Sequence, residues 1–328
     1  MDQWHVGSRN MLYPISVPKP DSAEDLIGYI DSAGRVVVNP TYSAGAYSEG
    51  FASVCRGDGL SGFINGDGEA SIAFKFRGLG LFQEGLCPIG QGSKVGYVNR
   101  SGQWQIEPSF AVAGRFSEGL AKVSLDGSSF GFVDRAGTLI FEPMYDQVGV
   151  FCNGFGAARH EGKWGYVGRD GSVIIPFQFE GPRAQVFTNG RAGVSVGGRW
   201  GYINSGGDWA VMPQYDDVRR FYEGFAPGRQ GEKWGLIDVA GRIRVTPRFN
   251  DLGEFDGGMA SASLDGKAGF VSPEGEWVVE PKFDKCYRFV GGLAMVRADC
   301  VFSYLSRSGA VVWTSEPHAM PQAPPFKE

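Results

Sequence analysis

The chain is poor in the residue types that most often carry catalysis and metal binding. Its 328 residues include only three histidines and five cysteines. Neither type forms a cluster with metal-ligand spacing. The cysteine count is odd and no Cys-x-x-Cys pair occurs, which favours free thiols in a reducing compartment over a disulfide framework or a zinc site.

Long hydrophobic runs and runs of one charge sign are missing as well. The chain carries 31 Lys and Arg against 36 Asp and Glu, for a net charge of −5, and both signs are scattered. Without a basic stripe, nucleic acid and anionic membranes are poor partners. No stretch of signal-peptide or membrane-span length is apolar enough, so we expect a soluble, cytoplasmic protein.

Glycine and aromatic residues, in contrast, are abundant. The sequence has 51 Gly, 18 Pro and 13% aromatic residues. Helix interiors tolerate glycine and proline poorly, which excludes a mostly helical protein. A disordered chain would lack so many large apolar rings. The composition therefore predicts a folded β protein with many turns.

The glycines recur in a register of about 34 residues. A glycine that is usually followed by a ring stands at the start of each of eight units: Gly28, Gly62, Gly96, Gly131, Gly165, Gly201, Gly235 and Gly269. A second glycine follows six residues later in every unit, and Tyr or Phe stands at +14. Ser303 continues the series in a ninth, incomplete unit. One repeat array therefore accounts for nearly the whole chain.

Each unit predicts three short strands. The first follows the starting glycine, a tight turn lies at the +6 glycine, and a second strand follows with apolar residues two apart. Proline at +12, present in six units, is expected to end that second strand. The +14 ring returns to the core, and a third strand begins after a glycine near +23.

The two ends leave the architecture open. We expect a cap strand and linker over residues 1–26, with a strand at Tyr13–Val17, the array over 27–313, and a disordered tail over 314–328. We favour an all-β, open, curved or superhelical solenoid of about eight and a half three-stranded repeats. The alternative is a closed propeller-like ring, in which the N-terminal strand completes the C-terminal unit.

Three central units begin with Trp-Gly, at Trp164, Trp200 and Trp234. Together with the Asp/Asn-x-x-Gly turn, the Pro-x-aromatic and the Glu-Gly-Leu/Phe-Ala segments, this pattern resembles the WG-repeat family of bacterial proteins. The resemblance implies an all-β repeat fold. It brings no reaction and no catalytic residues with it.

Apparent chemical motifs have structural explanations. The Gly-x-Gly-x-x-Gly at residues 57–62 precedes no helix, and Ser195 in a Gly-x-Ser-x-Gly match lies in a strand. Recurring acids at +15 are expected to cap the turn after the +14 ring rather than bind calcium. Glutamates before the +23 glycine are expected to form turn or inter-unit hydrogen bonds. The Trp-Gly tryptophans are expected to pack in the core or between repeats, with ligand stacking as the alternative.

Function is then expected in the segments that differ most between units, at +15 to +19. In a solenoid these segments would lie on one edge as an extended surface. Arginines with aromatic neighbours are typical interface anchors. The predicted partner-binding residues are Arg183, Asp216, Asp217, Arg219, Arg220, Tyr222, Tyr287 and Arg288.

The sequence thus favours a non-catalytic protein-binding scaffold without metal or cofactor. A toxin inhibitor or immunity-type partner is a specific version of this hypothesis. The alternative is a module that binds carbohydrate or cell-envelope ligands through exposed aromatic residues.

Overall fold

Strands account for all the regular structure of the described residues. The computed structural model describes residues 11–18, 25–43, 45–78 and 80–315, which form 33 strands in nine antiparallel sheets. No helix in these ranges is long and apolar enough to cross a membrane.

The nine sheets are called blades 1 to 9 in chain order. Blades 1 to 3 contain β1 (Tyr13–Pro18), β2 (Asp25–Ile30), β3 (Val36–Tyr42); β4 (Gly45–Ser48), β5 (Phe51–Cys55), β6 (Ser61–Ile64), β7 (Ala70–Phe76); and β8 (Leu86–Gln91), β9 (Lys94–Asn99), β10 (Trp104–Phe110). Blades 4 to 6 contain β11 (Val112–Ser117), β12 (Leu120–Ser124), β13 (Phe130–Asp134), β14 (Leu139–Tyr145); β15 (Gln147–Cys152), β16 (Phe155–His160), β17 (Lys163–Val167), β18 (Val173–Phe179); and β19 (Ala192–Val196), β20 (Arg199–Ile203), β21 (Trp209–Tyr215). Blades 7 to 9 contain β22 (Asp217–Val218), β23 (Phe225–Gln230), β24 (Lys233–Asp238), β25 (Ile243–Phe249); β26 (Asp251–Leu252), β27 (Ala260–Leu264), β28 (Lys267–Val271), β29 (Trp277–Phe283); and β30 (Lys285–Val290), β31 (Leu293–Ala298), β32 (Val301–Ser306), β33 (Val311–Thr314).

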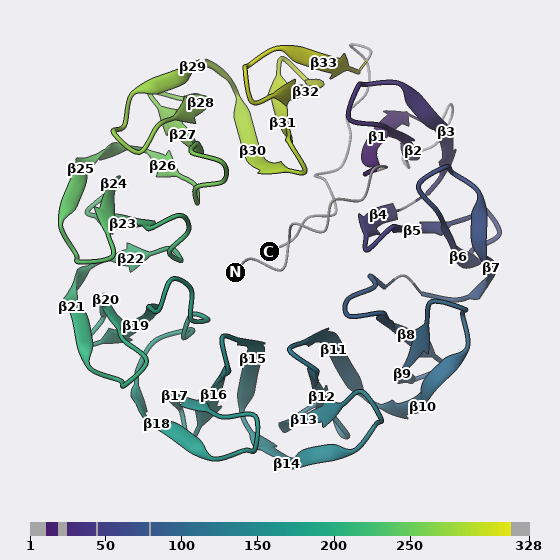
Figure 1. Cartoon of the computed structure of the whole chain (residues 1–328), viewed down its shortest axis with the longest axis horizontal. Helices are drawn as coiled ribbons and strands as arrows, with labels where there is room; N and C mark the ends of the chain where they lie inside the picture. Colours follow the sequence, from purple (N-terminus) through teal and green to yellow (C-terminus); the bar gives the residue numbers. More distant parts are fainter. Residues whose placement is uncertain (1–10, 19–24, 44, 79, 316–328) are drawn as a thin grey trace.

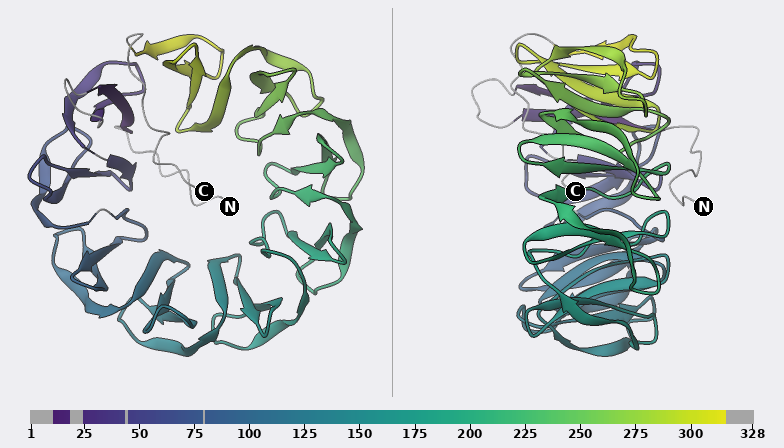
Figure 2. Two further views of the ribbon diagram at one scale, coloured as in Figure 1. Left: turned by 180° about the vertical axis from the view of Figure 1, so that it is seen from behind. Right: turned by 90° about the vertical axis from the view of Figure 1, so that its left-hand side faces the viewer.

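The blades are arranged around one axis as a ring (Figure 1). In a four-stranded blade the spatial order is the chain order: the first strand lies nearest the axis and the last at the circumference. Blades 3 and 6 follow the same path, although their innermost segments are paired only through isolated bridges such as Gln83 with Leu86 and Glu180 with Ser195. Seen edge-on in Figure 2, the blades form a flat disc.

The hydrophobic core lies between blades rather than within one centre. Nine buried clusters each join one blade to the next, and the ninth joins Tyr13, Ile15 and Ile30 of blade 1 to Leu293 and Tyr304 of blade 9. Because each blade buries both faces against neighbours, an open array would leave one apolar face uncovered at each end. Closure covers both faces.

The +6 glycines show the same closure. A Cβ on Gly102 would lie 2.5 Å from Ile72 of the preceding blade, and the same contact recurs around the ring. In blade 1, a Cβ on Gly34 would lie 2.2 Å from the carbonyl oxygen of Val312 in blade 9. The interface between the last and first blades is therefore built like the others.

The favoured open solenoid is wrong, and the closed-ring alternative is the observed fold. The N-terminal strand completes the ninth unit, as that alternative expected: β1 takes the place of its third strand and pairs with β2, as β12 pairs with β13 of the following repeat. The count of three strands per unit is wrong too, because the +15 to +21 segment forms a fourth, innermost strand. The expected tail from residue 316 onward lies outside the described residues.

The prolines at +12 do not end their strands. Pro40 lies inside β3 and Pro108 inside β10, both outermost edge strands. A proline is tolerated there because no further strand needs its missing N–H, and it blocks edge-to-edge pairing. The prediction that these prolines terminate the strand is therefore wrong.

Each starting glycine allows a close approach of the outermost strand. A Cβ on Gly96 would lie 2.5 Å from the Ile106 carbonyl oxygen and 2.6 Å from the Pro108 nitrogen. The register shifts between Trp104 and Ile106 at this point, so the strand bulges inward over the glycine. In blade 9 the glycine is Ser303, and β33 contains no proline.

Candidate functional site

The Trp-Gly tryptophans are buried in the hydrophobic clusters between blades. Trp164, Trp200 and Trp234 are 5%, 5% and 8% exposed. The guanidinium of Arg183 lies 4.5 Å above the Trp200 ring, and that of Arg219 lies 4.7 Å above Trp234. This burial confirms the predicted packing role. The tryptophan rings have too little exposed surface for a ligand to stack on them.

At three interfaces, the basic residue before the Trp-Gly position ties one blade to the next. Lys163 of blade 5 pairs with Glu180 of blade 6 at 2.8 Å. The same 17-residue spacing recurs in two further ion pairs: Arg199 with Asp216 at 2.5 Å, and Lys267 with Asp284 at 2.8 Å. The hydrogen bond from Lys163 and the one from Lys267 hold the pKa of the Glu180 and Asp284 carboxyls below their usual values.

The same acids at +15 cap a hairpin turn with their second oxygen. Oδ2 of Asp216 accepts a hydrogen bond of 2.6 Å from the backbone N–H of Gly231. Equivalent bonds reach Asp146 from Gly162, Glu180 from Gly197, Asn250 from Asp265 and Asp284 from Asp299. The acids therefore cap a turn, but it is the hairpin between the second and third strands of the blade and not the expected turn directly after the +14 ring. No group of three or more His, Cys, Asp or Glu residues with metal-binding geometry occurs among the described residues.

Glutamates at the turn after the innermost strand form a second inter-blade series, the glutamate ladder. Glu49 accepts hydrogen bonds from the backbone N–H groups of Glu84 and Gly85 at 2.6 and 2.9 Å. The ladder continues from Glu84 to residues 118 and 119, from Glu118 to residues 153 and 154, and from Glu223 to residues 257 and 258. The predicted inter-unit hydrogen bonds are confirmed.

Arginines on a neighbouring turn support this ladder. Arg100, between β9 and β10, donates to Oε2 of Glu49 at 3.0 Å. Arg169, in the same place in blade 5, donates to the Glu118 backbone carbonyl. Each carboxylate therefore meets two N–H groups and, at these interfaces, an arginine from the following blade.

The residues predicted to bind a partner lie on the inner rim of the ring. They belong to the first strand or segment of blades 6, 7 and 9, beside the axis in Figure 1, and not to outer-edge loops. The segments do line one edge, as expected, but this edge is the inner rim of a closed ring, where the +15 to +19 segment pairs with the strand after it. Val218, for example, pairs with Gly228 of β23.

Three of the predicted arginines are held by acids of the next blade. Arg183 pairs with Asp217 at 2.6 Å, Arg219 with Asp251 at 2.6 Å, and Arg220 with Glu254 at 3.0 Å. Asp216 is engaged by Arg199, as described above. These side chains are half-exposed, so they stabilise the ring while keeping a face toward solvent.

Tyr222, Tyr287 and Arg288 complete the predicted set. Arg288 is exposed on β30, and Tyr287 beside it lies 4.9 Å below the Lys285 ammonium. Arg220 lies over Tyr222 at 5.6 Å. Burial raises the pKa of Tyr222 above its usual value, although the charges of Arg220 and Arg288 oppose that rise. Blades 7 and 9 thus bring arginines and tyrosines together on one arc of the rim.

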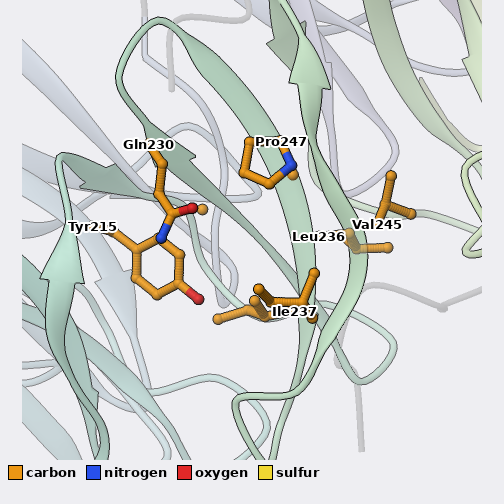
Figure 3. Close-up of a pocket in the computed structure, with 9 residues that line it drawn as sticks. Tyr215, Gln230, Leu236, Ile237, Val245 and Pro247 are labelled. Carbon is orange, nitrogen blue, oxygen red and sulfur yellow. The ribbon is translucent and has the colours of Figure 1, made fainter.

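A small apolar crevice between blades 6 and 7 is shown in Figure 3. Its empty volume is about 170 Å³, and its lining includes Tyr215, Leu236, Ile237, Val245 and Pro247. Ligand pockets usually enclose about 300 to 1,000 Å³. The crevice is therefore a packing seam of the kind found between blades.

A family model described as the WG containing repeat matches the chain eight times. The matched residues are 27–59, 62–94, 96–128, 130–164, 164–200, 200–234, 234–267 and 269–299. The chain belongs to the WG-repeat family. Its WG repeats begin in one blade and end in the next, so each repeat contributes to two blades.

The WG-repeat ring is similar to solved structures in fold alone. One is described as a eukaryotic initiation factor, with 11% identity, a TM-score of 0.64, and coverage of 93% of this chain and 96% of that one. A computationally designed protein, Ika8, shares 11% identity at a TM-score of 0.52, over 83% of this chain and 95% of its own. A search of curated proteins found no match.

The apparent catalytic motifs fall on structural positions of the WG repeats. Ser195 is 2% exposed and its hydroxyl donates to the Glu180 carbonyl at 2.8 Å. Residues 57–59 form the turn between strands β5 and β6, with no helix after them. His160 ends β16 and lies beside the rings of Tyr145 and Phe177. His5 and His318 lie outside the described residues.

The cysteines are free thiols. Cys87 is buried, and burial raises its pKa well above the usual value. Cys286 is half-buried, and burial raises its pKa to about 12. Both thiols are therefore protonated at neutral pH and serve as small packing groups.

Sequence reasoning missed the basic partners of the +15 acids and of the glutamate ladder. The signal was present as spacing, because Lys163 precedes Glu180 by 17 residues and Arg100 follows Glu49 by 51. With a 34-residue repeat, these intervals correspond to half a repeat and to one and a half repeats.

Proposed function

We propose that this WG-repeat ring is a non-catalytic protein-binding scaffold that presents the arginine- and tyrosine-rich arc of its inner rim to a partner. The observation that carries the proposal is the arc itself. Arg220, Tyr222, Tyr287 and Arg288 lie together on the innermost segments of a closed ring, where their backbone is fixed by pairing and by inter-blade ion pairs. Arginine and tyrosine are the residue types that most often dominate interface energetics.

The closed ring supports binding by pre-organisation. The glutamate ladder, the inter-blade ion pairs and the nine inter-blade clusters hold neighbouring blades together, so a partner meets a surface that is already ordered. Little conformational entropy is then lost on docking. A toxin inhibitor or immunity-type protein, which needs a broad and rigid surface, is the specific version we propose.

The roles of the chemically active groups favour binding over catalysis. The acids at +15 and in the glutamate ladder each hold defined turns, and Ser195 is closed off by its own hydrogen bond. Five free cysteines favour a reducing compartment, where we propose that the protein acts.

The test is affinity capture from an extract of the native host, with mass spectrometry of the bound proteins. Arg288→Glu is the test variant, because among the described residues this exposed arginine makes no ion pair within 4.0 Å. Arg244→Glu, exposed on the outermost strand β25, is the matched control. We expect the wild type and the control to capture one protein in common, and Arg288→Glu to lose it.

Circular dichroism of all three proteins is the check that they remain folded. If a folded Arg288→Glu protein captures the same protein in the same amount, the rim arc is not the binding surface. A partner that inhibits growth when expressed without this protein supports the toxin version, and a harmless partner overturns that version.

A further inference from the structure

The glutamate ladder is interrupted at three of the interfaces from blade 2 to blade 9. Asn153 and Asn189 replace the glutamate in blades 5 and 6, and their side chains still reach the next blade, at the Phe187 carbonyl and the Gly224 N–H.

Between blades 8 and 9 the position is a glycine. Glu223 of blade 7 caps the turn of blade 8 through the N–H groups of Gly257 and Gly258, at 2.7 and 2.8 Å. The next carboxylate in the series would have to come from residue 257. Because that residue is glycine, it supplies no carboxylate to the turn of blade 9 at Gly291 and Gly292, where the side chains of Met11 and Tyr13 lie beside Gly291.

The donors of that turn remain in place. Gly291 and Gly292 follow β30 as Gly257 and Gly258 follow the innermost segment of blade 8, and they lie on the exposed side of the ring. Among the described residues, no acceptor is hydrogen-bonded to either N–H. The two-donor arrangement that holds a carboxylate at four other interfaces is present here without one.

The arginine is also retained. Arg307 stands between β32 and β33, at the position of Arg100 in blade 3 and Arg169 in blade 5. Its guanidinium lies 5.0 Å above the Phe289 ring and donates to the Asp256 carbonyl oxygen at 2.6 Å. It therefore lies between the turns of blades 8 and 9, where the other ladder arginines meet their glutamates.

We propose that Gly291, Gly292 and Arg307 form a binding site for a carboxylate supplied from outside the ladder, which we call the carboxylate slot. Two N–H groups bind the two carboxylate oxygens, as they do for Glu49 and Glu223. Arg307 supplies the positive charge, as Arg100 does beside Glu49.

Backbone conformation does not require the glycine that opens the slot. Gly257 has φ of 59°, while Glu49, Glu84 and Glu223 occupy the same position of their turns at φ of 50°, 53° and 50°. The backbone of this turn therefore accommodates a glutamate elsewhere in the ring. At 257 a Cβ would meet the guanidinium of Arg307, the end of a flexible side chain, which would have to move aside. The glycine at 257 removes the internal carboxylate, and the φ angle of this position does not require a glycine.

The charged neighbours of the slot set its strength. The Asp256 carboxylate already accepts a hydrogen bond of 2.5 Å from Arg307 and so competes for its charge. Tyr13 of blade 1 donates to the Gly291 carbonyl at 2.5 Å, and burial raises its pKa to about 12, so it stays neutral. With one shared arginine and two N–H donors, the slot suits a single carboxylate, bound more weakly than a bidentate pair with a free arginine.

This assignment deepens the proposed function and rests on it for the source of the ligand: the partner presents an Asp or Glu side chain, or its C-terminal carboxylate, to the slot. A free small carboxylate has the same chemistry. The two sources are distinguished by testing the slot first with acetate alone and then with the captured partner.

The first experiment follows the glycine amides of the 15N-labelled full chain by NMR during titration with sodium acetate. Sodium chloride at the same ionic strength is the control. We expect the Gly291 and Gly292 amide signals to shift saturably with acetate only. Gly257→Glu supplies the missing carboxylate internally and should abolish the response, while Gly257→Gln should retain it.

Equal shifts with acetate and chloride, or an undiminished acetate response in Gly257→Glu, would overturn the slot whether or not the ring captures a partner. The second experiment repeats the affinity capture with Gly257→Glu and Gly257→Gln. Loss of the partner in Gly257→Glu alone supports a partner carboxylate in the slot. Unchanged capture with a positive acetate result overturns the partner as the source and leaves the scaffold function standing.

Discussion

The phenol of Tyr304 in the last blade donates a hydrogen bond of 2.8 Å to the backbone carbonyl of Pro14 in the first. The two residues are 290 positions apart in the sequence, and the bond is buried. Inside the ring, Tyr202 makes the corresponding bond to the Arg219 carbonyl of the next blade at 2.6 Å. The last interface therefore uses a tyrosine donor at the same position, but its acceptor lies one strand farther from the axis, on β1.

Removing that hydroxyl tests closure energetically. We expect Tyr304→Phe to lower the free energy of unfolding by about 1 kcal/mol, since it leaves a buried carbonyl without its donor. Tyr202→Phe is the matched control at an internal interface, and chemical denaturation measures both. A clear loss for Tyr202→Phe with none for Tyr304→Phe would mean that blades 9 and 1 are not in contact.

The bulge over each starting glycine predicts a sharp contrast within blade 3. Gly96→Ala places a methyl group 2.5 Å from the Ile106 carbonyl oxygen and should cost about 1 to 3 kcal/mol. Gly90→Ala on the adjacent strand meets nothing within 4 Å and should change stability by less than about 0.5 kcal/mol. Thermal and urea unfolding compare the two. Equal effects would show that the outermost strand does not approach Gly96.

The glutamate ladder predicts acid sensitivity. Burial acts to raise the pKa of Glu49, but hydrogen bonds from Gly85, Arg100 and Glu84 outweigh it and lower that pKa. A carboxyl with a lowered folded-state pKa stabilises the protein above its unfolded pKa of about 4.3, and this stabilisation is lost as the pH falls through the folded value. Glu49→Gln should cost about 1 to 2 kcal/mol at pH 7 and progressively less below pH 4.

Denaturant titrations between pH 3 and pH 7 measure this difference. Glu280→Gln, an exposed side chain on the outermost strand β29, is the control and should have little effect at any pH. A Glu49→Gln penalty that stays constant down to pH 3 would contradict the ladder's charge-assisted bonds.

Variants of the Arg220–Glu254 ion pair distinguish a structural role of Arg220 from a role in partner binding. Half-exposed pairs contribute about 0 to 1 kcal/mol, so Arg220→Glu should leave the ring folded. We expect it to lose the captured partner, and the double variant Arg220→Glu with Glu254→Arg to recover stability but not binding. Recovery of full capture by the double variant would show that Arg220 acts through the ring alone.

Much of the fold could be predicted from residues in register. Gly96 and Pro108 mark strands that the structure contains, and the +14 ring is buried as expected. The innermost strand was missed because a bulge interrupts its alternation, as between Ala113 and Phe116. Closure was predicted only as the alternative to an open solenoid, because β1 carries none of the glycine markers and the blade 9 residues that it packs against lie nearly 300 residues away.

The structural polar residues were more predictable than the binding surface. Asp216 and Glu49 recur at fixed positions, and their turn-capping and inter-unit roles follow from that recurrence. The basic partners were missed because an ion pair between units has no local sequence pattern. The carboxylate slot exists because Gly257 stands where other blades have a glutamate. This replacement can be recognised only after the glutamate ladder has been seen in the structure.

Closure of the ring determines where the rim arc lies, and one distance measures it. Val36 in blade 1 and Val311 in blade 9 hold the same position of their outermost strands, are 51% and 62% exposed, and accept spin labels through an unnatural amino acid. Ala70 in blade 2 supplies the reference pair with Val36. Pulsed electron spin resonance should give similar distances for the pairs 36–311 and 36–70. A distance for 36–311 that is several times longer would contradict the closed ring.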